Sequence, residues 1–163
     1  MADIEAVPRI VQLNGGRLVG KTRLQKSAYF LESLGVGFDL DFEYHHYGPY
    51  SEELARLADD ARALGLLDVD WGRTADGDEY AIYRSAVRQH FAENHRTDDP
   101  RRDVLRLLSE YSAIELELAA TADFLEKNGY GSEAWKETRR RKASKISEER
   151  VIRAKQLLDR LRR

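Results

Sequence analysis

The most specific chemical motif in this chain is a glycine-rich segment followed by lysine and threonine. Residues 15–22 read GGRLVGKT, which matches the pattern G-x-x-x-x-G-K-[ST] of loops that hold nucleotide phosphates. In such a loop backbone amides surround the phosphates, Lys21 would contact the terminal phosphates and Thr22 would bind magnesium. The pattern requires a buried parallel strand before it, but residues 9–13 form only a weak strand pattern and no strand–helix alternation follows. Nucleotide binding is therefore a minor alternative to a glycine pair that ends one helix before Thr22 caps the next.

The histidines do not form a recognisable catalytic or metal-binding set. His45 and His46 are adjacent, so on a strand their side chains point to opposite faces. His90 and His95 are five residues apart, whereas a helical metal pair is spaced by four. The chain has no cysteine, and no Ser/His/Asp grouping stands out. We therefore expect no enzymatic activity, no metal and no cofactor.

The length of 163 residues predicts one domain, or one domain with a tail. Since cysteine is absent, a reducing cytoplasm is the expected setting. The first residues show no signal-peptide pattern, and no apolar stretch approaches the roughly 18 residues of a membrane span. We expect a cytoplasmic protein without a membrane partner, and a homo-oligomer remains open.

The net charge of −2 conceals an uneven distribution. Residues 136–163 carry 12 basic and 4 acidic side chains, so their net charge is +8 and that of the first 135 residues is −10. Such a split indicates an interaction surface or pairing between the two parts, while a solvated basic helix is an equal alternative.

Periodicity predicts the elements of the first half. Thr22 and Gln25 have the spacing of a capping box, and apolar residues then recur every three or four positions to residue 34. Residues 38–44 alternate between apolar and acidic, which predicts a half-buried strand. Residues 47–50 (YGPY) predict a turn, and residues 51–64 predict a helix capped by serine.

A β-hairpin is predicted from alternating runs at 66–71 and 79–84, joined by an Asp-Gly turn. With a short helix over residues 3–13, the order helix, helix, strand, helix, hairpin is that of a winged helix. The expected fold is mainly α with a small antiparallel hairpin, comprising a winged-helix-like part (1–84) and a C-terminal helical bundle (85–163). We expect the two parts to pack as a single compact unit.

Three start signals organise the helical second half. Asp99 before Pro100 indicates a capped start, and the pair Ser112 and Glu115 has capping-box spacing. Ser147 is the expected cap of the last helix.

A winged helix suggests nucleic-acid binding, but the predicted third helix has a net charge of −2, which phosphates would repel. Basic residues gather instead near the C-terminus: Arg139, Arg140, Arg141, Lys142 and Lys145. A DNA-binding transcription regulator that uses this basic region is therefore the alternative function. The same cluster could equally bind an acidic protein surface, including that of this chain.

Two segments resemble a known family. Residues 21–30 (KTRLQKSAYF) and 47–51 (YGPYS), followed by an acidic helix, resemble the Panacea (SocA-like) antitoxin domain and the related YwgA-like bacterial and archaeal proteins. The resemblance covers about residues 17–70 and implies a small, mostly helical domain that neutralises or presents a partner protein, often a toxin. This chain lacks the tryptophan that usually precedes the Gly-Pro turn and continues as Pro-Tyr-Ser where Panacea has Pro-Val, so it lies nearer the YwgA-like proteins.

The leading hypothesis is a non-enzymatic protein-interaction module, antitoxin-like or adaptor-like. Basic and aromatic residues around the Gly-Pro turn are the predicted partner contacts: Lys21, Arg23, Gln25, Lys26, Tyr47 and Tyr50. Aromatic and arginine side chains are favoured at interfaces. The alternative for each residue is a structural role in shaping the turn or filling the core.

Overall fold

A computed structural model describes residues 2–163, and its fold is mainly helical with a small antiparallel hairpin, as predicted. The strands form two small antiparallel sheets. The helices and strands are α1 (Ala6–Leu13), β1 (Arg17–Val19), α2 (Lys21–Ser33), β2 (Glu43–His45), β3 (Gly48–Tyr50), α3 (Glu52–Ala63), β4 (Leu67–Arg73), β5 (Glu79–Ser85), α4 (His95–Leu108), α5 (Ala113–Leu125), α6 (Ala134–Arg141) and α7 (Glu148–Leu161). Short π and 3₁₀ turns join α5 to α6 and α6 to α7.

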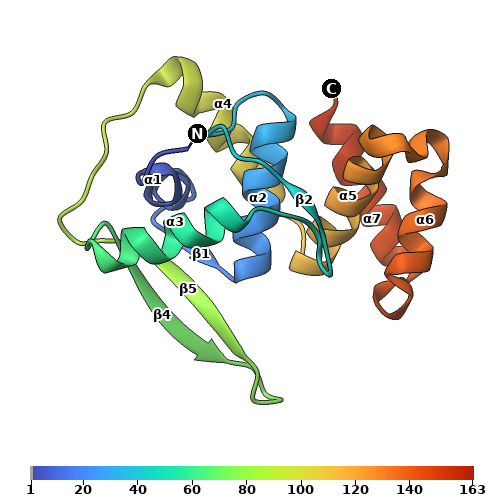
Figure 1. The fold of residues 1–163 in the computed structure, drawn as a ribbon, viewed down its shortest axis with the longest axis horizontal. Coiled ribbons are helices and arrows are strands. Elements are labelled where there is room, and N and C mark those ends of the chain that lie inside the picture. Colours follow the sequence, from blue (N-terminus) through green and yellow to red (C-terminus); the bar gives the residue numbers. More distant parts are fainter. Residues whose placement is uncertain (1) are drawn as a thin grey trace.

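The larger sheet has the strand order β1-β5-β4. The hairpin β4–β5 confirms the prediction, and it extends away from the helices (Figure 1). The short strand β1 was not predicted; Leu18 in it is buried and pairs with Tyr83 of β5.

A second hairpin, β2–β3, corrects two predictions. The turn lies at His46 and Tyr47, because Gly48–Tyr50 is a strand that pairs antiparallel with β2. Most of the strand predicted for residues 38–44 is an irregular segment. Its backbone is satisfied by side chains instead of a neighbouring strand, since the Glu32 carboxylate accepts from the N–H groups of Phe38 and Leu40 at 3.1 and 2.9 Å.

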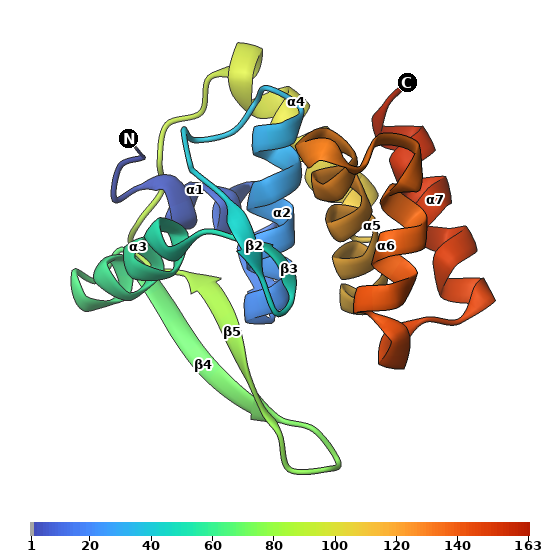
Figure 2. The same cartoon turned by 45° about the vertical axis from the view of Figure 1, so that its right-hand side comes forward.

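The core is centred on α2 and α5, which pack side by side (Figure 2). α2 buries Leu24, Phe30 and Leu31, and α5 buries Leu116 and Ala119. α5 also contacts β3, α6 and α7, so this one helix joins the first and second halves of the chain. No helix within residues 2–163 is both long and apolar enough to cross a membrane.

Most predicted helix starts are confirmed by their caps. Ser51 and Ser147 accept from backbone N–H groups of α3 and α7, and Ser112 forms both bonds of a capping box. Two starts are corrected. The N-cap of α2 is Gly20, so Thr22 lies inside the helix. The predicted capping box does not form, because the Gln25 side chain bonds to Ser51 instead.

The other corrected start is that of α4. Asn94, five residues before the predicted cap Asp99, accepts from the N–H of Arg96 and caps the helix. Asp98 accepts from the Asn94 N–H at 2.8 Å in return, and Pro100 consequently lies inside the helix.

Candidate functional site

Two residues of the KTRLQK motif hold the hairpin β2–β3 onto α2. The Gln25 amide accepts from the Ser51 N–H at 2.8 Å and donates to the Ser51 carbonyl at 3.0 Å. The Lys26 ammonium donates to the Pro49 carbonyl at 2.8 Å. Both side chains are buried, so these polar contacts are made inside the protein, where an unmade bond would be costly.

Beneath the hairpin, three lysines surround one carboxylate. Glu117 of α5 is buried and lies 3.1 Å from the ammonium of Lys142 and 2.8 Å from that of Lys145. Lys142 also donates to the carbonyl of His46 in the hairpin turn. We call Lys26, Glu117, Lys142 and Lys145 the lysine cluster.

The lysine cluster shifts the pKa of its most enclosed member. Burial lowers the pKa of Lys26 to about 7; attraction to Glu117 opposes this shift, and repulsion from Lys142 and Lys145 adds to it. Burial also lowers the pKa of Lys142. The lysine cluster therefore supports the hairpin through polar contacts, and it contains more basic than acidic side chains.

A second buried network fixes α2 to α5 and α7. The Asp123 carboxylate accepts from the Tyr29 hydroxyl at 2.6 Å and from Arg162 at 2.9 Å, and lies 3.0 Å from the Lys127 ammonium. Burial acts to raise the pKa of Asp123, but these hydrogen bonds hold it below its ordinary value. Burial and the bond to Asp123 raise the pKa of Tyr29.

The predicted partner contacts do not form one surface. The prediction that Gln25 and Lys26 contact a partner is wrong, because both side chains are buried against this chain's own backbone. Arg23 donates to the carbonyls of Leu108 and Tyr111 at 3.1 and 2.6 Å and so links α2 to the α4–α5 junction.

The remaining three predicted contacts lie in two places. Lys21 and Tyr50 line a small pocket between α2, α3 and β5. Tyr47 lies at the turn of the hairpin β2–β3 and is 56% exposed.

The tip of this hairpin is rich in aromatic rings. The Lys145 ammonium lies 4.6 Å from the centre of the Tyr47 ring, and Arg141 lies 4.5 Å from the Tyr44 ring and 5.3 Å from the Tyr130 ring. An open pocket of about 580 Å³ adjoins them. We call this region the hairpin-tip surface and define it as Tyr44, His45, His46, Tyr47, Tyr130 and Arg141.

The basic residues 139–145 are largely paired within the chain. Arg139 binds Glu148 at 2.8 Å, while Arg140 and Arg141 both bind Glu137. These two arginine bonds lower the pKa of Glu137 to about 2. With Lys142 and Lys145 on Glu117, each of the five cations has a carboxylate partner. Among these five, pairing with the acidic first part of the chain is confirmed for Lys142 and Lys145 alone, since the three arginines pair within residues 136–163. Contact of Lys142 with a nucleic acid is corrected, because its side chain is buried.

The phosphate-loop interpretation of residues 15–22 is wrong. Helix α1 precedes the segment, and strand β1 lies within it, paired antiparallel with β5. A phosphate loop instead follows a parallel strand and wraps the phosphates with its own backbone. The ammonium of Lys21 lies 5.3 Å from the Trp71 ring.

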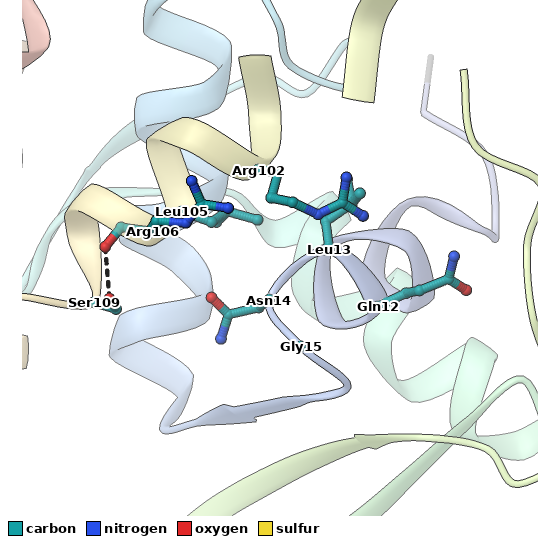
Figure 3. Close-up of a pocket in the computed structure, with 8 residues that line it drawn as sticks. All are labelled: Gln12, Leu13, Asn14, Gly15, Arg102, Leu105, Arg106 and Ser109. Atoms are coloured by element: carbon teal, nitrogen blue, oxygen red, sulfur yellow. Dashed lines mark hydrogen bonds between the residues drawn. The ribbon is translucent and has the colours of Figure 1, made fainter. Parts of the chain in front are cut away.

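A further pocket lies between the end of α1 and α4 (Figure 3). Figure 3 shows Arg102 and Arg106 on the α4 side of Asn14, with Gln12 pointing away from Arg106. Arg102 binds Glu93 and Arg106 lies 3.6 Å from Asp103, so both charges are already compensated. Among the residues that the structure describes, no group of three His, Asp or Glu side chains could hold a metal ion.

Sequence reasoning missed Glu117 and Asp123, the acidic centres of the two buried networks. Both lie on α5, whose neighbouring positions are almost entirely apolar and buried. A carboxylate flanked by apolar residues in a helix is the signal that could have marked them, because a buried charge needs a partner.

No protein-family model matches this chain. Over 54 residues it is 35% identical to the Uncharacterized protein YwgA of Bacillus subtilis (strain 168), a match that covers 33% of this chain and 32% of YwgA. The chain thus spans about a third of the length of this curated relative. The similarity supports a YwgA-like relationship and does not extend it to the Panacea domain.

Proposed function

We propose that the protein is a non-enzymatic interaction module that binds a partner protein through the hairpin-tip surface. The observation that supports this most is Tyr47, a large side chain that is 56% exposed on a turn whose backbone is held from beneath. Lys26 and Lys142 bind the carbonyls of Pro49 and His46 on either side of it. Because the turn is already ordered, little further entropy is lost when a partner binds.

The composition of the hairpin-tip surface also supports protein binding. Tyrosine and arginine are enriched at the centres of interfaces. Arg141 donates to the Tyr130 hydroxyl at 2.9 Å and to Glu137 at 2.7 Å, so its guanidinium is held in one orientation. Such a fixed side chain offers a planar, partly desolvated surface to a partner.

The antitoxin-like part of the proposal rests on the resemblance of the KTRLQK and YGPYS segments. In this structure those segments build the support of the hairpin through Gln25, Lys26 and Ser51. We infer that the shared motif maintains the scaffold, while the exposed tip selects the partner. Under this proposal the partner is a protein such as a toxin.

Affinity capture from the native host tests the proposal, with the wild-type chain, Tyr47→Ala and the control Val87→Ala as baits. Val87 is an exposed apolar residue outside the hairpin-tip surface. We expect one specific protein to be retained by the wild type and the control, and its affinity for Tyr47→Ala to fall by about 30-fold, as at an interface hot spot. Equal retention by all three baits, or no specific protein, would contradict the proposal.

The alternative is a winged-helix regulator that binds DNA. The strand order β1-β5-β4 with helices α1 to α3 and a projecting hairpin supports a winged-helix-like arrangement. Its charges argue against groove binding, since α3 has two more acidic than basic side chains and the cations at 139–145 are paired. Filter binding over a salt series decides this, because phosphate contacts weaken steeply as salt rises. Absence of binding at low salt would exclude it.

A further inference from the structure

A small pocket of about 110 Å³ lies between α2, α3 and β5. It is separate from the hairpin-tip surface and shares no lining residue with it. Leu24 and Ala58 form apolar walls, while Tyr50, Tyr83, Lys21 and Asp59 contribute polar groups. The volume suits a small molecule, of the size of a small amino acid.

Tyr83 is the buried polar side chain of this pocket. It is 5% exposed, and its hydroxyl makes no hydrogen bond with any group among residues 2–163. Burial raises the pKa of Tyr83 to about 12, and the charges that add to this shift are on Asp59 and Tyr50, which line the same pocket. The Tyr83 side chain thus lines the pocket, and its hydroxyl, which has no partner among residues 2–163, is free to bond to a small ligand that enters there.

Lys21 and Asp59 place opposite charges on this pocket. Both side chains are exposed, and neither forms an ion pair with another residue of the described chain. This differs from the basic segment 139–145, where every cation has a carboxylate within reach. A fully anionic ligand would meet the Asp59 carboxylate and a fully cationic one would meet the Lys21 ammonium.

The N-terminus of α2 gives the pocket a preference for a negatively charged ligand group. Lys21 is the first residue of the helix, and the N-cap Gly20 provides no side-chain acceptor for the first backbone N–H groups. A helix N-terminus favours a negative group through its exposed N–H groups and its dipole. The Lys21 side of the pocket is therefore suited to a carboxylate.

We propose that this pocket binds a free α-amino acid with a small hydroxyl side chain, such as serine. Its carboxylate pairs with Lys21 and its ammonium with Asp59. Its side chain lies between Leu24 and Ala58, where its hydroxyl bonds to that of Tyr83. This site does not depend on the proposed partner surface, so either can be disproved without the other.

Titration of the ¹⁵N-labelled full-length protein with L-serine tests this proposal by NMR. We expect saturable amide shifts in residues 21–25 and 55–59. Two analogues remove one charge each: N-acetyl-L-serine lacks the ammonium and L-serine methyl ester lacks the carboxylate. Each should bind about 10-fold to 100-fold more weakly than L-serine, since a hydrogen bond to a charged group is lost.

Asp59→Asn and its control Asp60→Asn separate the pocket from the general charge of α3. Asp60 is the exposed neighbour and does not line the pocket. We expect Asp59→Asn to weaken L-serine binding by about 10-fold or more and Asp60→Asn to leave it unchanged. Tyr83→Phe, which keeps the ring, should weaken binding of L-serine but not of L-alanine.

Three results would overturn the proposal: no saturable shift with excess L-serine, equal binding of N-acetyl-L-serine, or equal binding by Asp59→Asn and wild type. Because Asp59 is exposed, its variant remains informative even if Tyr83→Phe fails to fold.

Discussion

Lys26 lies wholly inside the protein, although its side chain carries an ammonium that water would solvate well. The single carbonyl of Pro49 accepts its hydrogen bond, and the nearest compensating charge is that of Glu117. Burial removes the ammonium from water and so disfavours its charged form, which lowers the pKa of Lys26.

The lowered pKa of Lys26 predicts a pH-dependent stability. Between the folded value of about 7 and the ordinary value of 10.5, the unfolded chain binds more protons than the folded protein. The free energy of unfolding should therefore rise with pH across this window. We expect the urea midpoint to increase from pH 7 to pH 9.5 in wild type and to increase much less in Lys26→Met, as measured by circular dichroism.

Lys155→Met is the control for this pH series, because Lys155 is an exposed lysine of α7. It should retain the wild-type slope. The lowered pKa of Lys142 leaves a smaller slope in Lys26→Met. The raised pKa values of Tyr29 and Tyr83 oppose the rise, mainly as the pH approaches and passes the ordinary tyrosine value of 10. If Lys26→Met kept the full slope, Lys26 would not be the group responsible.

At the scale of secondary-structure elements, the hairpin β2–β3 packs closely against helix α5 at Gly48. This residue has φ +88°, and a Cβ placed there would overlap the Thr121 hydroxyl oxygen of α5. That oxygen is itself buried without a hydrogen-bond partner. Close approach of the strand to α5 thus requires glycine for its shape as well as for its backbone angle.

We predict that Gly48→Ala destabilises the protein by more than the cost of the backbone angle alone. Gly77 provides the comparison, since it also has φ +88° but a Cβ there meets nothing within 4 Å. Gly77→Ala should lose about 1 kcal/mol of unfolding free energy and Gly48→Ala about 2 to 4 kcal/mol, by urea unfolding.

The double variant Gly48→Ala/Thr121→Ala removes the overlapping oxygen and should recover part of this loss. Equal destabilisation by Gly48→Ala and Gly77→Ala would show that the overlap is relieved without cost.

Elements with local signals could be predicted from the sequence, and those with distant partners could not. The predicted caps Ser51, Ser112 and Ser147 are correct because the capping oxygen and the backbone N–H that donates to it are only three residues apart. Strand β1 escapes prediction because its three residues are a strand only through pairing with β5.

The irregular segment before β2 has the same explanation. Its alternating residues predict a strand, but Glu32 binds two of its N–H groups and Arg101 donates to the carbonyls of Val36 and Gly37. These contacts come from α2 and α4, at separations that local patterns do not report. The same limit applies to the candidate site, because the prediction places Gln25 and Lys26 on a partner surface, whereas both are buried against backbone groups more than 20 residues away.

For the whole molecule, the polar contacts of α2 cross the predicted boundary between residues 1–84 and 85–163. Arg23 binds carbonyls at the α4–α5 junction and Tyr29 binds Asp123. Lys142 also crosses the boundary, since it donates to the His46 carbonyl, whereas the ion pairs of the basic C-terminal residues stay within residues 85–163. The two parts therefore depend on each other.

We predict that neither part folds independently. Expressed alone, residues 1–84 and 85–163 would each expose the apolar face that α2 and α5 share, and each would leave buried polar groups unpaired. Urea unfolding followed by circular dichroism should show no cooperative transition for either fragment, in contrast to the full chain. A fragment of residues 1–84 with a sharp transition and dispersed NMR resonances would refute this.

The hairpin β4–β5 extends from the body of the molecule (Figures 1 and 2), and its end, Thr74–Asp78, is a polar turn. Exposed loop tips accept inserted peptides with little effect on the fold. An affinity peptide inserted after Gly77 would immobilise the protein on a resin and leave the hairpin-tip surface unmodified. The β4–β5 turn is therefore a suitable insertion site for the affinity peptide used to capture a partner.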